Sequence, residues 1–154
     1  MSNRQAIDEF LRERALAVVG ASRGGRKFGN TVYRELLAKG YRVFAVHPEA
    51  PAIEGKPCWP DLKLLPEPVG GVVVVVPPAR TEEVVRQAHE AGIRRVWMQQ
   101  GAESPEAVRF CEANGMSVVQ KECIPMFAEP AGFHRFHRWL WGLLGKLPVE
   151  AARP

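Results

Sequence analysis

The sequence has few cysteines, and no two of them lie close together. Cys58, Cys111 and Cys123 are the three thiols among 154 residues, and no C-x-x-C motif occurs. This spacing argues against zinc-ribbon and thioredoxin-like sites, and an odd, dispersed set does not indicate a disulfide framework. The cysteines therefore predict a protein of the reducing cytoplasm.

Long apolar runs and a signal peptide are also missing. The longest apolar run, Val69 to Pro78, is far shorter than the roughly 20 residues that span a bilayer. Residues 1–14 are charged and lack the apolar core of a signal peptide, so we expect no targeting segment and no membrane partner. A chain that is 46% hydrophobic and 25% charged can bury a core, and its length fits one domain, residues 1–154.

Short apolar runs alternate with helical segments along most of the chain. Three times, a segment of helical spacing ends at a glycine (Gly40, Gly92 and Gly115) and a strand-like run follows. This alternation predicts an α/β, Rossmann-like, doubly wound fold with a mostly parallel five-stranded sheet and helices on both faces. The predicted strands are Leu16–Val19, Tyr41–Val46, Val72–Val76, Arg95–Met98 and Ser117–Val119.

Two segments do not follow this alternation. Residues 48–68 contain six prolines and little periodicity, which predicts a long connection between the second and third strands. Residues 133–147 place Phe136, Leu140, Leu143 and Leu144 at helical spacing, which predicts a C-terminal amphipathic helix. We expect that helix to pack on its own domain; docking on a second subunit or on a membrane surface are the alternatives.

The most informative segment is the glycine-rich turn, residues 20–30, which follows the first predicted strand and opens the first predicted helix. Glycines let a phosphate approach the backbone closely, and amides at a helix N-terminus point toward it. Arg23, Arg26 and Lys27 add positive charge there, and the chain as a whole carries a net charge of +4. The first strand of such a sheet commonly ends at a ligand site. The turn therefore predicts a phosphate-binding site.

The known phosphate motifs narrow the choice of ligand. Gly20 and Gly25 have P-loop spacing, but the lysine stands one place late and no Ser or Thr follows it to hold magnesium. Ser22 replaces the second glycine of the dinucleotide motif, and His47 follows the second strand where an NAD site has an acidic residue. NAD therefore fits poorly, whereas NADP and coenzyme A (CoA) both remain open on charge.

Several short motifs, taken in order, resemble the small CoA-binding protein family. They are Val18–Ser22, Gly40-Tyr41-x-Val43, a proline at 48, Ile53-x-Gly55, Trp97-x-Gln99-x-Gly101 and Cys123. The family is similar to the N-terminal domain of the succinyl-CoA synthetase α subunit, and the resemblance covers roughly residues 8–127.

The resemblance implies that CoA lies along the carboxyl ends of the strands. The glycine-rich turn would contact the phosphates, the end of the third strand would line the adenine or pantetheine groove, and the end of the fourth would flank the pantetheine arm. The cofactor-binding residues predicted in this way are Gly20, Ala21, Ser22, Arg23, Gly24, Gly25, Arg26, Lys27, Asn30, His47, Pro48, Val76, Pro77, Pro78, Met98, Gln99, Gln100 and Gly101.

The chain departs from the family at the end of the second strand. His47-Pro48 stands where the family commonly has Asn-Pro, and Ala50 stands at about the place of a lysine in the synthetase. The chain also ends before the second synthetase domain, which carries a phosphorylated histidine. We therefore expect non-covalent binding of CoA or acyl-CoA by a carrier, sensor or assembly module that is not an enzyme. The alternatives are an NADP-dependent oxidoreductase and a regulatory module with a vestigial nucleotide site.

The remaining reactive and aromatic residues point to no second activity. Cys123 follows the fifth strand without a visible partner base, so a packed thiol is expected rather than a redox-active one. His134 and His137 would share a helix face but lack a third metal ligand, so no metal is expected. Trp139 and Trp141 lie near arginines, yet a docked helix is favoured over nucleic-acid binding. A homodimer or an unknown protein partner stays open.

Overall fold

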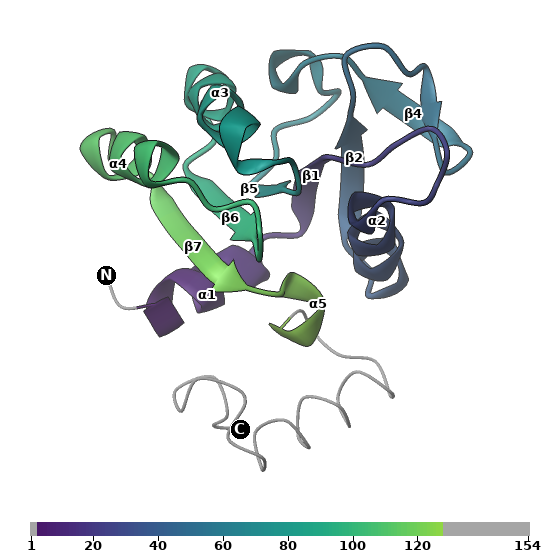
Figure 1. Ribbon diagram of the computed structural model, residues 1–154. Helices are drawn as coiled ribbons and strands as arrows, with labels where there is room; N and C mark the ends of the chain where they lie inside the picture. Colours follow the sequence, from purple (N-terminus) through teal and green to yellow (C-terminus); the bar gives the residue numbers. More distant parts are fainter. Residues whose placement is uncertain (1–2, 128–154) are drawn as a thin grey trace.

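The computed structural model describes residues 3–127, which form one seven-stranded sheet flanked by helices (Figure 1). The strands are β1 (Ala15–Val19), β2 (Arg42–Val46), β3 (Ala52–Ile53), β4 (Lys56–Trp59), β5 (Gly71–Val74), β6 (Arg95–Gln99) and β7 (Ser117–Glu122). The helices are α1 (Asn3–Arg12), α2 (Phe28–Ala38), α3 (Pro78–Glu90), α4 (Pro105–Ala113) and α5 (Ile124–Phe127), with a 3-10 turn, η1 (Leu62–Leu64).

The strand order places the first strand at the centre of the sheet. The order is β3-β4-β2-β1-β5-β6-β7, and every neighbouring pair is parallel except β3 and β4. The chain runs outward from β1 through β2 to β4, then returns to the other side of β1 with β5. In open α/β sheets a ligand crevice lies at the carboxyl ends of the strands where the order reverses in this way. The crevice is therefore expected between β1 and β5.

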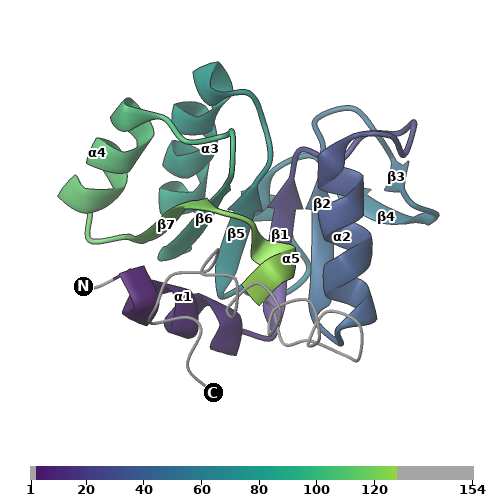
Figure 2. The same cartoon turned by 60° about the horizontal axis from the view of Figure 1, so that its bottom comes forward.

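The helices cover both faces of the sheet. Helices α1, α2 and α5 lie on one face and pack with strand residues such as Leu16, Val73 and Trp97 (Figure 2). Helices α3 and α4 cover the opposite face, over Val72, Val74 and other residues. Successive strand residues alternate between the two faces, and both faces are buried, which explains the continuous valine run of β5.

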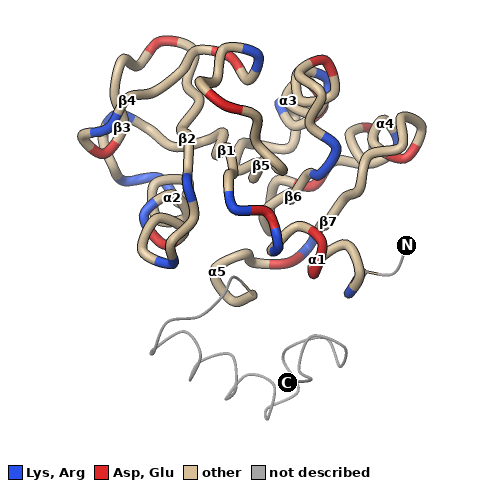
Figure 3. Tube along the Cα trace, turned by 180° about the vertical axis from the view of Figure 1, so that it is seen from behind, with Lys and Arg blue, Asp and Glu red and all other residues tan. Residues whose placement is uncertain are grey.

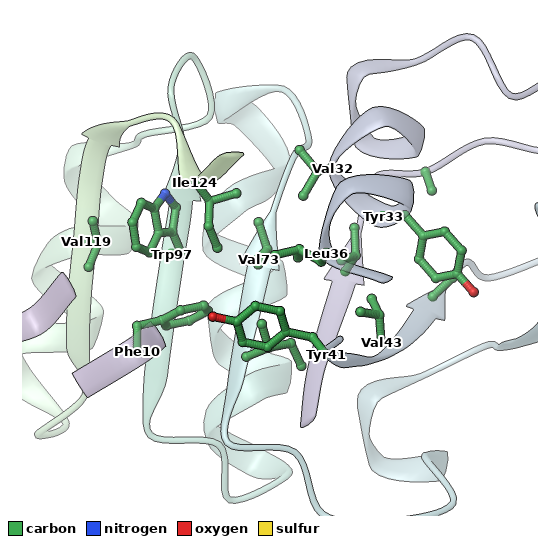
Figure 4. Packing of buried hydrophobic residues seen from close by; sticks show 14 of the residues in the cluster. Phe10, Val32, Tyr33, Leu36, Tyr41, Val43, Val73, Trp97, Val119 and Ile124 are labelled. Carbon is green, nitrogen blue, oxygen red and sulfur yellow. The ribbon is translucent and has the colours of Figure 1, made fainter. Parts of the chain in front are cut away.

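The buried aromatic side chains lie on the face of α1, α2 and α5 (Figure 4). The indole of Trp97 is fully buried; it contacts the Phe10 ring edge-on, with ring centroids 5.4 Å apart, and donates to the Glu122 carbonyl at 3.0 Å. The Tyr41 hydroxyl donates to the Leu11 carbonyl at 3.0 Å. These contacts join α1 to the sheet and satisfy the buried polar groups of both aromatic residues.

The structure confirms the Rossmann-like, doubly wound fold with helices on both faces, but the prediction of five strands was wrong. The segment 48–68, predicted as an irregular connection, forms the antiparallel hairpin β3–β4, and β4 then extends the parallel sheet beside β2. The hairpin turn is Glu54-Gly55, with φ of 53° and 74°. A two-residue turn with two positive φ values usually has Asn or Asp first, so glutamate concealed the signal.

The structure also shows how α4 begins and adds two helices to those that were predicted. The Ser104 hydroxyl caps α4 by accepting from the Ala107 amide at 3.3 Å, and Pro105 is the first residue of the helix. Helices α1 and α5 were not predicted. The predicted C-terminal helix, residues 133–147, lies outside the described residues, so that helix and the single domain over 1–154 stay predictions.

Candidate functional site

A pocket of about 340 Å³ lies at the carboxyl ends of the strands, where the order reverses at β1. The ends of three neighbouring strands form its walls: residues 19–22 at the end of β1, 46–49 at the end of β2 and 75–77 after β5. Lys27 and Arg80 complete the lining. Two larger hollows of about 510 Å³ lie away from these strand ends, one at α1 and β7 and one at η1. We call the hollow at β1 the crossover pocket.

Two glycines let the backbone pack closely at this pocket. A Cβ on Gly20, whose φ is 129°, would collide with the Val75 carbonyl oxygen of the neighbouring segment. A Cβ on Gly29 would collide with the Gly20 carbonyl oxygen. The first glycine therefore lets β1 turn beside the end of β5, and the second lets α2 begin close against that turn. These are the tasks that the glycines of nucleotide-binding turns perform.

The glycine-rich turn is held from inside by Asn30, which is fully buried. Asn30 Oδ1 accepts from the Ser22 amide at 2.8 Å and from the Ser22 hydroxyl at 3.2 Å. Asn30 Nδ2 donates to the Ser22 carbonyl at 2.9 Å and to Glu54 Oε2 at 2.9 Å. In the structure the Asn30 side chain shapes the glycine-rich turn through these bonds, and the predicted contact of Asn30 with a ligand stays a prediction.

The Glu54 carboxylate connects the glycine-rich turn to the β3–β4 hairpin. Besides Asn30, it accepts from Arg34 on α2 at 3.0 Å. The hydrogen bonds from Arg34 and Asn30 hold the pKa of Glu54 below its usual range. The hairpin missed by the sequence prediction thus supports the turn beside the crossover pocket.

Two helix N-termini and two cationic side chains meet at the crossover pocket. Lys27 is the N-cap residue of α2 and Pro77 that of α3, and no side chain caps either helix. Both residues line the pocket, and Arg80 in the first turn of α3 lines it too. Free amides at a helix N-terminus and the helix dipole both favour an anion. This end of the sheet is therefore built for a negatively charged group.

Arg23 and Arg26 are exposed on the glycine-rich turn and do not line the pocket. Over the described residues, basic and acidic positions are interspersed along the trace (Figure 3). The positive charge at the pocket is therefore local, supplied by Lys27, Arg80 and the helix ends rather than by a basic face.

The end of β2 forms the third wall. His47 Nδ1 accepts from the backbone amides of Glu49 and Ala50, each at 3.0 Å. His47, Pro48 and the exposed Glu49 line the pocket. The imidazole therefore closes a short turn directly beside the place where an anion would lie.

The structure brings some of the predicted ligand residues to the crossover pocket and leaves the others outside. Eight of them line it: Gly20, Ala21, Ser22, Lys27, His47, Pro48, Val76 and Pro77. The lining also includes five residues that were not predicted: Val19, Val46, Glu49, Val75 and Arg80. Arg80 was not among the predicted residues, although it lies in the first turn of α3, which begins at Pro78. Pro77-Pro78, where proline often opens a helix, was the available signal.

Two predicted groups lie elsewhere. Gly24 and Gly25 belong to the outer part of the glycine-rich turn, and Pro78 is the first residue of α3. At the end of β6, Met98 and Gln99 are buried, and Gln99 Oε1 accepts from the Ile124 amide at 3.0 Å. Gln100 and Gly101 are exposed beyond that strand. Ligand contact by these residues stays a prediction.

The thiols show no sign of activation. Burial raises the pKa of Cys58 and of Cys123, and it raises the pKa of Cys111 to about 12. A raised pKa disfavours the nucleophilic thiolate, in agreement with the expectation of packed thiols.

Residues 3–127 contain neither a metal-binding cluster nor a membrane-spanning helix. In that range no cluster of His, Cys, Asp and Glu side chains could hold a metal ion. No helix in the same range is long and apolar enough to cross a bilayer. The candidates His134, His137, Trp139 and Trp141 lie outside the described residues.

Comparison with known proteins gives consistent matches over this region. The chain is 32% identical over 130 residues, 78% of its length, to acetate–CoA ligase (ADP-forming) I of Archaeoglobus fulgidus, of which the match covers 19%. It is 25% identical over 129 residues to the α subunit of acetate–CoA ligase (ADP-forming) II of Pyrococcus furiosus, covering 77% of this chain and 28% of that subunit. The chain thus spans less than a third of either ligase polypeptide.

A solved structure and a family model complete the comparison. A conserved hypothetical protein from Pyrococcus furiosus superposes with a TM-score of 0.68 at 41% identity, covering 72% of this chain and 96% of that one. The model of the CoA binding domain matches residues 14–128, which include every segment that lines the crossover pocket. The chain therefore belongs to the CoA binding domain family.

Proposed function

We propose that this chain binds CoA or an acyl-CoA non-covalently at the crossover pocket. The observation that carries the proposal is the meeting of two helix N-termini, Lys27 and Arg80 at one pocket where the strand order reverses. This arrangement suits the phosphates of an adenine nucleotide, because amides, helix dipoles and cations all favour an anion at that point.

The other walls of the pocket suit the uncharged parts of CoA. Val46, Val75, Val76 and Pro77 offer apolar surface beside the cationic end. Small-molecule sites commonly combine apolar walls with a few placed polar groups in this way. The chain's own contribution is to orient the ligand: the glycine-rich turn and the α2 N-terminus would hold phosphate oxygens, and the strand ends would hold the adenine or pantetheine group.

We further propose that the protein acts in the cytoplasm as a carrier, sensor or assembly module without catalysis of its own. Among the described lining residues, Ser22 and His47 have side chains of the kinds that serve as a catalytic nucleophile or base. Both side chains instead make hydrogen bonds within the protein. The Ser22 hydroxyl donates to Asn30 Oδ1, and His47 Nδ1 accepts two backbone amides. Neither is placed as an activated nucleophile or base. A second copy of the chain or another protein would then use the bound CoA.

Calorimetric titration with CoA, dephospho-CoA, NADP and NAD tests this proposal. CoA should bind the wild-type protein most tightly. Lys27→Ala and Arg80→Ala should each weaken CoA binding about 5- to 20-fold, since a hydrogen bond to a charged group contributes about 1.5 kcal/mol. Arg12→Ala is the matched control, because Arg12 is an exposed arginine at the end of α1, before β1 and away from the pocket lining. It should leave the affinity unchanged.

The other outcomes have clear meanings. Tightest binding of NADP would favour the oxidoreductase alternative. An equal loss of affinity in Arg12→Ala would show that only net charge matters, not the crossover pocket. No binding of any of the four ligands would leave a regulatory module with a vestigial nucleotide site.

A further inference from the structure

His47 has an unusual task at the end of β2: one ring nitrogen accepts two hydrogen bonds from the backbone. Nδ1 lies 3.0 Å from the Glu49 amide nitrogen and 3.0 Å from the Ala50 amide nitrogen. A nitrogen that accepts hydrogen bonds must be unprotonated, and a neutral imidazole then carries its proton on the other nitrogen. The two amides therefore select the neutral ring with the proton on Nε2.

This pair of hydrogen bonds fixes the wall of the crossover pocket. The His47 backbone is held to β4, because its amide donates to the Trp59 carbonyl at 2.9 Å. Pro48 has no N–H, so the amides of Glu49 and Ala50 are the first donors after His47. Ala50 is only 5% exposed, so without Nδ1 its amide would lose its partner in a place that water reaches poorly.

We propose that His47 is a positioning residue whose neutral imidazole holds the 47–50 turn against the ligand, so that affinity falls when the ring is protonated. The proposal rests on the proposed function, since the ligand is CoA in the crossover pocket. It assigns to His47 a role that runs through backbone geometry and not through charge.

Because of the charged and titratable groups around the ring, the direction in which affinity changes on protonation distinguishes two explanations. Lys27 and Arg80 line the same pocket, as does Glu49 on the turn itself. On β4, the Cys58 thiol lies close enough to the His47 backbone for its pKa to be influenced by it, although burial raises that pKa overall. A proton on Nδ1 would face two N–H groups and open the turn, which weakens binding. The added positive charge acting alone would instead tighten the binding of an anion. Geometry and charge thus predict opposite directions.

Three substitutions of His47 test whether an acceptor at the place of Nδ1, rather than of Nε2, is needed for CoA affinity. In His47→Asn, the amide oxygen takes the place of Nδ1, because asparagine accepts from backbone amides two residues on in the same kind of turn. His47→Gln has no acceptor at that place, and His47→Ala has none at all. Calorimetry with CoA at neutral pH should give His47→Asn an affinity within about threefold of wild type, and His47→Gln and His47→Ala a loss of about tenfold, as expected for an unpaired buried amide.

The pH profile supplies a readout that a general structural defect would not give. Between about pH 8 and about pH 5, where histidines gain their charge, wild-type affinity should fall more than that of His47→Asn. Titration of the CoA phosphates is common to both proteins and cancels in this ratio. If His47→Asn binds as weakly as His47→Ala, or if acidification tightens binding in the wild type alone, the proposal is overturned.

Nitrogen-15 NMR of the ligand-free protein tests the turn without CoA, with the His47→Asn spectrum identifying the His47 signals. Nδ1 should be unprotonated and Nε2 protonated at neutral pH; the reverse assignment would refute the turn itself. If the expected tautomer is seen but no protein binds CoA, the proposed function fails, and with it the effect of the turn on affinity. The two failures are therefore distinguishable.

Discussion

Asparagine 30 is the residue whose replacement tests most directly how the glycine-rich turn is built. Its side chain is fully buried and makes four hydrogen bonds, three to Ser22 and one to Glu54. Asn30→Ala removes all of them while adding no new atoms. The amide and carbonyl of Ser22, which start the turn, then lose their side-chain partner.

The expected loss of stability follows from those partners. Each buried donor or acceptor left unpaired costs about 1–3 kcal/mol, and water would restore part of this at the half-buried Ser22. We expect a decrease of about 2–4 kcal/mol in the free energy of unfolding. For a chain of this size that corresponds to a fall of about 5–15 °C in Tm.

Urea unfolding and calorimetric CoA titration together measure the effect. Asn30→Ala should lose both stability and CoA affinity, because the turn beside the pocket is no longer held. Asn114→Ala is the matched control: its amide donates only to the Phe110 carbonyl, at 2.8 Å, after the end of α4. It should lose about 1 kcal/mol or less and keep its CoA affinity. A loss below about 1 kcal/mol in Asn30→Ala, or an unchanged affinity, would refute this account of the turn.

Two other predictions concern close packing and thiol reactivity. Gly20→Ala should destabilise the protein more than Gly24→Ala. A Cβ at Gly20 meets the Val75 carbonyl, whereas one at Gly24 meets no atom within 4 Å. Equal unfolding midpoints of the two variants in urea would contradict this. Cys111 should resist a thiol reagent at mildly alkaline pH in the native protein and react after unfolding, because burial raises its pKa to about 12. Mass spectrometry of labelled peptides measures the extent of reaction. Rapid labelling of Cys111 in the native protein would contradict the prediction.

The fold class could be derived from the sequence because it depends on local patterns. Helical segments that end at Gly40, Gly92 and Gly115 and run into short apolar strands occur in both the sequence and the structure. Periodicity and terminal glycines act over a few residues, so they are visible without tertiary contacts. The same applies to the position of the glycine-rich turn between β1 and α2, which put the predicted site at the strand end where the crossover pocket lies.

Features that depend on distant partners could not be derived. The β3–β4 hairpin was missed because Glu54 is an uncommon residue at its place in the turn, and its carboxylate is paired with Asn30 and Arg34 of α2. The role of Asn30 likewise depends on burial, which the sequence does not display. A polar residue beside a phosphate loop is equally compatible with holding the ligand and with holding the loop.

The sequence by itself determined that this chain alternates helices and strands and carries a glycine-rich turn after the first strand. Only the tertiary structure decided which side chains meet at the crossover pocket. Arg80 and His47 come from segments 33 residues apart in the chain (80 minus 47), yet both line it. Parallel strands bring their carboxyl ends to one edge, and the order of the strands, fixed by long-range pairing and core packing, selects which ends become neighbours.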